Sequence, residues 1–331
     1  MEKLILAIET SCDDTAAAVT IGRRVLSNAV FTQIEHEKYG GVVPEIASRN
    51  HILKLPYITD EALKAAGVGF DALWAIAVTD GPGLIGALLT GVSYAKALAY
   101  YHALPLIPVH HIEGHICSLY LSYETLEPPF LCLVVSGGHS HIAVVEDYGK
   151  YRLVGKTRDD AVGEAFDKTA RALGLGYPGG PKLEELAQKG KPVYNYPRGF
   201  KGEPHLDFTF SGLKTAVINH MHNLEQKGTA YSKADIAASF QAEAVAFLVD
   251  NTFEAARREG IKRIGIAGGV SANSALREEF KKRAQHEGVT VLLPQQQYCT
   301  DNAAMIGCAA AYSKPCKDPL ALNANASKTL F

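Results

Sequence analysis

The sequence lacks closely spaced cysteine pairs, long apolar runs and an excess of basic residues. Its six cysteines are scattered with no Cys-x-x-Cys pair, which is typical of reduced thiols rather than of a disulfide framework or a zinc ribbon. The longest apolar stretch, residues 86–101, contains Lys96 and is shorter than the roughly 20 residues that cross a bilayer. Glu2 leads directly into a short strand, so no signal peptide is expected. These absences predict a soluble cytoplasmic protein with no contact to a membrane.

The charge balance limits the kind of partner that the whole chain can attract. Lysine and arginine together number 33 and aspartate and glutamate 35, which gives a formal net charge of −2. A dedicated nucleic-acid-binding protein usually carries a broad basic field, and this composition excludes one. Contact with RNA would therefore need a local patch or a surface shared with a partner. The length of 331 residues, 47% of them hydrophobic, is sufficient for two domains.

Two histidines four residues apart, His111 and His115, indicate a metal site. Residues at this spacing share one face of a helix, so both imidazoles can bind one ion. A zinc peptidase needs its general-base glutamate directly after the first histidine, whereas Glu113 lies two residues on, roughly 200° around the helix. The inverted peptidase motif fails as well, because Gly114 takes the place of its glutamate. The alternative to a metal site is a structural or surface histidine pair.

Three polar turns each follow an apolar run that is typical of a buried strand. Residues 4–19 and 130–145 both predict a strand, a turn with hydroxyl groups and a second strand. Residues 263–277 predict a strand that passes through Gly-Gly into a helix. Glycine lets backbone amides approach an anion, and a helix N-terminus adds partial positive charge. One Gly-Gly pair is more often a plain turn, but three such turns favour a nucleotide or another phosphate-bearing ligand.

The order of the expected elements is that of an α/β protein with two similar halves. Strands are predicted near residues 4–9, 15–20, 25–31, 72–79, 105–109, 130–135, 141–146, 262–267 and 289–293, and helices near 43–66, 85–100, 161–174, 182–189, 232–258, 272–287 and 301–311, besides the metal helix. Pro128-Pro129 predicts the main boundary. An N-terminal lobe, 1–128, is completed by the C-terminal helix and tail at 302–331, and a C-terminal lobe spans 129–301. The repeated turns imply a duplicated architecture with a cleft between the halves.

Short segments along the whole chain match the pattern of one family. They are Ile-Glu-Thr-Ser-Cys-Asp-Asp-Thr (8–15) and the segments 40–51, 110–115, 135–139, 159–168, 176–181, 210–215, 267–273 and 299–306. Together they closely resemble the bacterial TsaD family of tRNA N(6)-adenosine threonylcarbamoyltransferases, formerly described as O-sialoglycoprotein endopeptidases. The departures are Ser140 where threonine is common, Ser271 where alanine is common, and the tail after Ala311. The role of that tail is therefore undefined.

The resemblance implies a duplicated actin-like, sugar-kinase-like (ASKHA) α/β fold with two lobes and an interlobe nucleotide cleft. It implies transfer of threonylcarbamoyl from threonylcarbamoyl-AMP to the N(6) amine of the adenosine 3′ to the anticodon, in tRNAs that read codons beginning with adenine, with release of AMP. Implied partners are the tRNA anticodon stem-loop, a shorter ASKHA homologue (TsaB-like) and a small P-loop ATPase (TsaE-like). The alternatives on the same fold are a nucleotide-gated chaperone or regulatory ATPase and a sugar kinase.

For the metal, the resemblance adds Asp301 to His111 and His115. Two nitrogens and one carboxylate with open positions suit one iron(II) ion per chain as a Lewis acid, with zinc(II) as the alternative. This requires the last helix to return to the first domain, and the alternative for Asp301 is an N-cap. A mixed anhydride is already activated, so no nucleophile is assigned and catalysis is expected from positioning and charge stabilisation.

For the substrate, the resemblance points to the second lobe. Val135, Ser136, Gly137, Gly138 and His139 are expected at the acyl-phosphate end, Asp167 and Glu184 at the ribose hydroxyls, Gly180 close to the sugar, and Asn273 at the adenosine half. The alternatives are structural: a surface pair of Asp167 with Arg171, a solvated Glu184, and a plain turn at Gly180.

Two further regions are candidates for macromolecular contacts. The loop-rich insert at 191–211 interleaves aromatic and basic residues, namely Tyr194, Tyr196 and Phe200 with Lys191, Arg198 and Lys201. Rings for unpaired bases and cations for phosphates suit an anticodon loop, and the alternative is an ordinary loop whose rings pack on the body. The helix that carries Glu45, Arg49 and His51, with the helix after Gly86, is the candidate partner surface.

Overall fold

The structure is a computed structural model that describes residues 3–200 and 205–331. Within these ranges it contains two five-stranded sheets, each in a compact unit of its own. The first unit comprises the described residues up to Pro128 together with Asp147–Tyr151 and Pro294–Phe331. The second comprises Pro129–Glu146 and the described part of Arg152–Leu293. No helix in the described ranges is long and apolar enough to cross a membrane.

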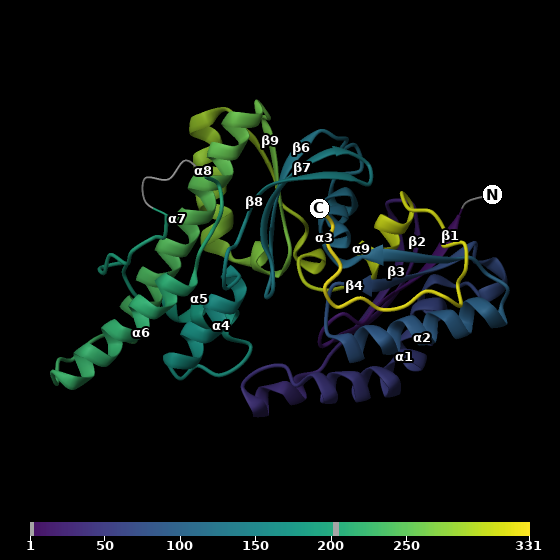
Figure 1. The fold of residues 1–331 in the computed structure, drawn as a ribbon, viewed down its shortest axis with the longest axis horizontal. Coiled ribbons are helices and arrows are strands. Elements are labelled where there is room, and N and C mark those ends of the chain that lie inside the picture. Colours follow the sequence, from purple (N-terminus) through teal and green to yellow (C-terminus); the bar gives the residue numbers. More distant parts are fainter. Residues whose placement is uncertain (1–2, 201–204) are drawn as a thin grey trace. The chain divides into compact units, whose positions relative to one another are not determined.

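The first unit is built on a mixed sheet with the strand order β3-β2-β1-β4-β5 (Figure 1). Its elements are β1 (Leu4–Glu9), β2 (Asp14–Ile21), β3 (Arg24–Thr32), η1 (Ile34–Tyr39), α1 (Pro44–Ala66), η2 (Phe70–Ala72), β4 (Ala75–Gly81), α2 (Ile85–Tyr101), β5 (Leu106–His110), α3 (His111–Ser122), η4 (Gln296–Tyr298) and α9 (Ala303–Ala310). β1 is antiparallel to β2 and parallel to β4, and β4 is parallel to β5. The parallel strands therefore end at one edge of the sheet, where α3 begins.

Helices cover both faces of this sheet, as two neighbouring residues of β2 show. Val19 packs with Ile58 of α1, whereas Thr20 lies against Gly307 of α9. Successive strand side chains point to opposite faces, so α1 and α9 must lie on opposite sides. Figure 1 shows the same arrangement, with α1 and α2 on one face and α3 and α9 on the other. The C-terminal helix thus returns to the first unit.

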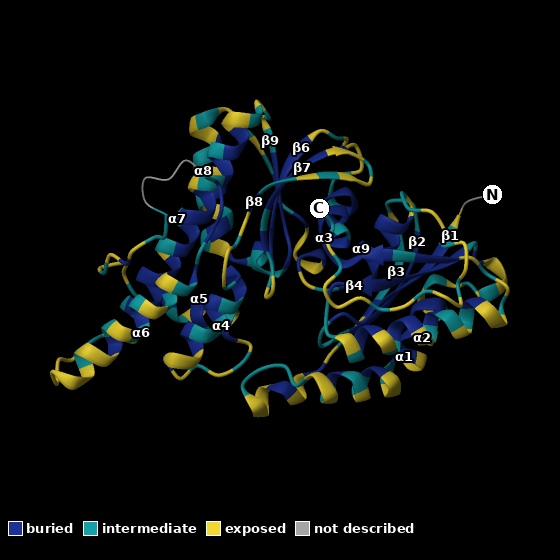
Figure 2. Ribbon diagram, in the orientation of Figure 1, coloured by how far each residue is buried: buried dark blue, intermediate teal, exposed yellow. Residues whose placement is uncertain are grey.

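The second unit has the strand order β10-β9-β6-β7-β8. Its elements are β6 (Phe130–Val135), β7 (Ser140–Asp147), β8 (Lys150–Lys156), α4 (Val162–Ala172), α5 (Gly179–Ala187), α6 (Ser211–Gln226), α7 (Lys233–Glu259), β9 (Arg263–Ala267), η3 (Gly269–Ala272), α8 (Ser274–Glu287) and β10 (Thr290–Leu292). β6 pairs antiparallel with β7 and parallel with β9. Helix α7 begins at the Ser232 cap and supplies Phe240 and Phe247 to the core. Figure 2 shows the buried strands of both sheets and the exposed end of α6.

Two of these elements, β8 and α6, are absent from the sequence prediction. β8 is a partly exposed edge strand with the charged ends Lys150 and Lys156, so it lacks an apolar run. α6 buries only Leu213, Val217 and Met221, which are four residues apart. The polar residues between them make this helical periodicity hard to recognise in the sequence.

Candidate metal centre and ligand-binding turns

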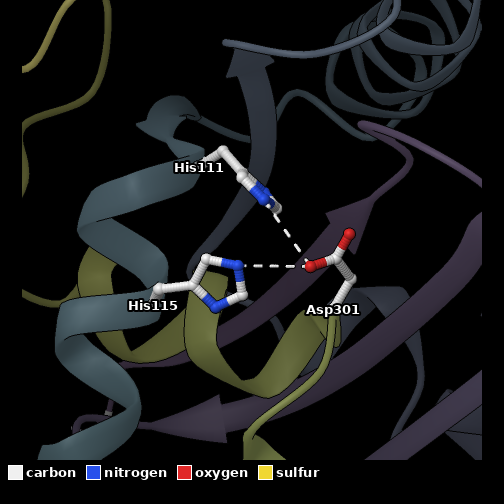
Figure 3. A group of neighbouring side chains, drawn as sticks. All are labelled: His111, His115 and Asp301. Carbon is white, nitrogen blue, oxygen red and sulfur yellow. Dashed lines mark ion pairs between the residues drawn. The ribbon is translucent and has the colours of Figure 1, made fainter. Parts of the chain in front are cut away.

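The structure brings together the three side chains that the sequence predicts as metal ligands. Nε2 of His115 lies 3.2 Å from Oδ1 of Asp301, and Nε2 of His111 lies 3.6 Å from the same oxygen (Figure 3). One ligand atom from each residue falls within 4.8 Å of the other two. Two atoms that each bind one ion at about 2.1 Å lie no more than about 4.2 Å apart. The two distances from the histidine nitrogens to the Asp301 oxygen, 3.6 and 3.2 Å, therefore fit a shared ion.

The histidines come from the first turns of α3, and Asp301 precedes α9. Asn302 caps α9, because its side chain accepts a hydrogen bond from the Met305 amide at 2.9 Å. The alternative role of Asp301 as the N-cap is therefore wrong. Its carboxylate instead faces the two imidazoles across the junction of α3 and α9.

Gly114 allows this close junction of α3 and α9. A Cβ atom at position 114 would come 2.7 Å from Cδ1 of Ile306 and 3.3 Å from Cγ of Met305. Both are shorter than ordinary van der Waals contacts, so a larger residue would push α9 away. The glycine that excludes the inverted peptidase motif thus has a packing role here.

Burial of His115 supplies a test of whether the site suits a metal. Its side chain has no exposed surface, and among the described residues neither ring nitrogen makes a hydrogen bond of good geometry, although Nε2 lies 3.2 Å from the Asp301 carboxylate. A buried nitrogen without a partner is costly unless something else binds it. The donor set, with Nε2 of His115 directed at the Asp301 carboxylate but outside hydrogen-bond geometry, therefore fits a divalent ion at this position, whose binding remains a prediction.

Glu9, at the end of β1, orients His111. Its Oε2 lies 3.1 Å from Nδ1 of His111 and accepts a 2.6 Å hydrogen bond from the Thr79 hydroxyl, while its Oε1 accepts from the Ser11 amide. A carboxylate at one imidazole nitrogen directs the other nitrogen to a metal in many proteins. The sequence prediction missed Glu9, although an acidic residue inside a buried strand was an available signal.

The charges around His111 shift the pKa of both members of this pair. Burial alone would lower the pKa of His111, but the carboxylates of Asp301 and Glu9 outweigh burial and raise it to about 9. Burial would likewise raise the pKa of Glu9, and the neighbouring imidazole lowers it instead. The two carboxylates therefore favour a positive charge on the His111 ring, which lies between them.

In the second unit, the predicted anion-binding turn joins β6 to β7. The Ser136 amide donates to the His139 carbonyl at 2.9 Å, which closes the turn and leaves Gly137 and Gly138 exposed. Two other backbone segments pack against it: a Cβ on Gly163 would meet the Ser136 carbonyl at 2.6 Å, and one on Gly268 would meet the Val135 carbonyl at 2.4 Å. The turn, the start of α4 and the Gly-Gly turn after β9 therefore lie together.

The residues predicted to bind the ribose and the adenosine form hydrogen bonds with the first residues of helices α5 and α8. Oδ1 of Asp167 accepts from the amides of Gly179 and Gly180 at 2.9 and 3.0 Å, at the start of α5. Oε1 of Glu184 accepts from the Ser274 amide at 2.8 Å. Asn273 is the N-cap of α8, and its Nδ2 donates to Gln241 at 2.9 Å. These contacts give each residue a structural role and leave ligand binding a prediction.

The described parts of the insert, residues 191–200 and 205–211, favour the alternative of a loop whose rings pack on the body. Tyr196 is buried and bonds His220, and Tyr194 and Phe200 pack against the core of the unit. Arg198 is bound by Glu243 and Asp250 at 2.6 and 2.8 Å. Lys201 lies outside the described residues. The rings and the guanidinium are thus engaged within the chain rather than presented to RNA.

A family model matches most of this chain. The model described as TsaD, tRNA N6-adenosine threonylcarbamoyltransferase, matches residues 24–308. A protein of that name from Clostridium perfringens (strain SM101 / Type A) is 54% identical over 314 residues, which cover 94% of this chain and 93% of the relative. Another from Clostridium kluyveri (strain ATCC 8527 / DSM 555 / NBRC 12016 / NCIMB 10680 / K1) is 51% identical over 330 residues, covering 98% and 97%.

Solved structures with low sequence identity share the fold. HypF from T. kodakarensis is 16% identical with a TM-score of 0.63, over 93% of this chain and 47% of HypF. Component A of the (R)-2-hydroxyglutaryl-CoA dehydratase of Acidaminococcus fermentans is also 16% identical, with a TM-score of 0.55 over 94% and 97% of the two chains. At this identity the similarity concerns the fold alone. The predicted actin-like, sugar-kinase-like α/β fold is confirmed.

Proposed function

Because this chain belongs to the tRNA N6-adenosine threonylcarbamoyltransferase family, whose members are tRNA-modifying transferases, we propose a specific reaction for it. The donor is threonylcarbamoyl-AMP, and the acceptor is the N6 amine of the adenosine 3′ to the anticodon in tRNAs that read codons beginning with adenine. The amine nitrogen attacks the carbamoyl carbon, the bond from this carbon to the phosphate oxygen breaks, and AMP leaves. The proton that the amine loses balances the reaction.

The observation that carries this proposal is the convergence of His111, His115 and Asp301 in a member of this family. His111, His115 and Asp301 would hold one divalent ion, iron(II) in preference to zinc(II), which would supply a Lewis acid able to polarise a carbonyl group. Glu9 fixes the His111 ring, and the β1–β2 turn adds the Ser11 hydroxyl, 3.1 Å from Nδ1 of the same ring. Such prior positioning lowers the barrier without a covalent intermediate.

The turn Val135–His139 is proposed to hold the phosphate of the adenylate. No atom of the described residues lies within 4 Å of where a Cβ on the exposed glycines Gly137 and Gly138 would be, so a phosphate can approach the backbone amides. Asp167, Gly180, Glu184 and Asn273 are proposed to hold the nucleoside, beside the starts of α5 and α8 to which they are bonded.

We also propose that α1 and α2 form the surface for a shorter homologue of TsaB type. Ile52, Leu53 and Tyr57 of α1 are each more than 60% exposed, and Ile85 and Leu89 of α2 are exposed as well. Exposed apolar side chains on two neighbouring helices are consistent with a protein interface. A small P-loop ATPase of TsaE type is proposed as the second partner, and the cytoplasm as the location. These proposals rest on the family.

The proposed reaction is tested by the choice of acceptor. We expect the chain, with both partners, to transfer threonylcarbamoyl from threonylcarbamoyl-AMP to an unmodified tRNA that reads a codon beginning with adenine. The matched control is the same tRNA with guanosine in place of the adenosine 3′ to the anticodon, which has no N6 amine. Equal labelling of both tRNAs, or no labelling of either, would contradict the proposal. A sugar kinase or a regulatory ATPase would modify neither.

A further inference from the structure

Residues 312–331 after α9 lie on the first unit rather than projecting from it. The Cys316 amide donates to the Leu106 carbonyl at 2.9 Å, so this segment bonds the start of β5. Further on, Nζ of Lys96 in α2 donates to the Leu322 carbonyl at 2.9 Å. Figure 1 shows this segment in yellow, and its end lies near α3.

The segment is anchored at the C-terminal end of β4. The Asn325 amide donates to the Asp80 carbonyl at 2.8 Å, and both carboxylate oxygens of Asp80 accept from Nζ of Lys328, at 2.6 and 2.7 Å. The glycine that ends β4 leaves room for the segment, because a Cβ on Gly81 would come 2.1 Å from the Asn325 carbonyl oxygen. Asp80 is almost fully buried, so its partner is held firmly.

From this anchor the segment reaches the residue that starts the metal helix. Nε2 of His110 lies 3.2 Å from the Lys328 carbonyl oxygen, and Nδ1 of His110 accepts from the Ile112 amide at 3.1 Å. A neutral imidazole that accepts at Nδ1 carries its proton at Nε2, so it donates to that carbonyl. His110 is therefore held in the tautomer that caps α3, one residue before His111.

We propose that Lys328 is a positioning residue for the metal centre. Its side chain forms an ion pair with Asp80, and its carbonyl accepts a hydrogen bond from His110. His110 in turn caps the first turn of α3, from which His111 and His115 project. The same anchor also supports the β1–β2 turn, since the Gly83 amide donates to the Ala326 carbonyl at 3.3 Å and the Leu84 amide donates to the Ser11 carbonyl at 2.8 Å. This inference rests on the metal centre of the proposed function.

The test measures zinc(II) affinity of the purified chain by competition with a chromogenic chelator. Lys328→Ala is expected to weaken binding about tenfold, as for loss of other groups that orient metal ligands. Lys328→Arg keeps the ion pair with Asp80 and is expected to restore most of the affinity. The matched control is Lys317→Ala, which removes the same charge from an exposed position in the same segment. The inference is overturned by wild-type affinity in Lys328→Ala.

A second readout does not need the metal. In the metal-free protein, Lys328→Ala is expected to speed hydrogen exchange of the Ile112 amide about fivefold, as for loss of one helix cap. Adding Lys328→Ala to His110→Ala is expected to change exchange no further, because both act through one imidazole. Additive effects would show that the segment acts by another route and overturn the inference.

His111→Ala distinguishes failure of the inference from failure of the proposed function. If His111→Ala abolishes zinc binding and Lys328→Ala does not weaken it, only the role of Lys328 is wrong. If His111→Ala binds zinc like the wild type, the metal centre itself is wrong. A lower melting temperature in Lys328→Ala with unchanged affinity and unchanged exchange at Ile112 would assign the residue a merely structural role and overturn the inference.

Discussion

Glu9 Oε2 lies 3.1 Å from Nδ1 of His111, so the far nitrogen of the ring faces Asp301. The relationship joins the end of β1 to the start of α3, two elements about a hundred residues apart in the chain. The contact with Glu9 restricts rotation of the His111 ring and keeps its Nε2 directed at Asp301.

Glu9→Gln is expected to weaken metal affinity by about 10- to 100-fold, because the amide removes the charge that raises the basicity of His111. Metal titration of the purified variant measures this effect. Glu45→Gln is the control, since Glu45 is an exposed acid on α1 bonded only weakly to Arg49. Equal losses in both variants would show that bulk charge, and not the Glu9–His111 contact, determines affinity.

His111→Ala and His115→Ala are each expected to remove the ion and abolish transfer while the fold persists. Asp301→Asn is expected to cost less, since its amide oxygen can still coordinate. Elemental analysis gives the metal content, and circular dichroism checks the fold. Full occupancy in both histidine variants would exclude this site.

Gly114→Ala is expected to destabilise the protein by about 1–3 kcal/mol, because the new Cβ overlaps Cδ1 of Ile306. Combining it with Ile306→Val removes that carbon and should recover part of the loss. Gly212→Ala should not destabilise the protein, because Gly212 lies in the first turn of α6 and no atom of residues 3–200 or 205–331 comes within 4 Å of its new Cβ. Chemical unfolding measures all three. No rescue by Ile306→Val would contradict this packing of α3 against α9.

Ser136→Ala and Ser140→Ala separate ligand binding from stability in one turn. The Ser140 hydroxyl accepts from the Val162 amide at 2.9 Å in a buried site, so its loss is expected to cost about 1–3 kcal/mol of stability. The bond that closes the turn uses the backbone of Ser136, which leaves its hydroxyl for the phosphate. Ser136→Ala should therefore weaken a non-hydrolysable threonylcarbamoyl-adenylate analogue by about 10- to 100-fold at unchanged stability. Calorimetric titration measures the affinity of both variants for the analogue, and chemical unfolding measures their stability. Lower stability in Ser136→Ala with unchanged analogue affinity would contradict this division of roles.

Local patterns were sufficient for much of this structure. The helical spacing of His111 and His115 and the strand–turn–strand of β6 and β7 depend on near neighbours, and both were predicted. The place of Asp301 depends on where α9 packs, so it followed from a family resemblance and not from spacing.

Tertiary contacts account for what was missed. The role of Gly114 depends on a side chain of α9, and that of Glu9 on a histidine of α3. Sequence patterns cannot show such pairs. The same holds for Glu184, which could pass for a solvated helix residue until its bond to the Ser274 amide is seen.

The most direct test of the account is the activity of one protein preparation with and without its metal. The chain, with its partners, threonylcarbamoyl-AMP and tRNA, is assayed after chelation and again after iron(II) or zinc(II) is restored, with His111→Ala in parallel. We expect that chelation abolishes transfer, that a restored ion recovers it in the wild type, and that no ion recovers it in His111→Ala. Full transfer by the chelated wild type, or by His111→Ala, would contradict it.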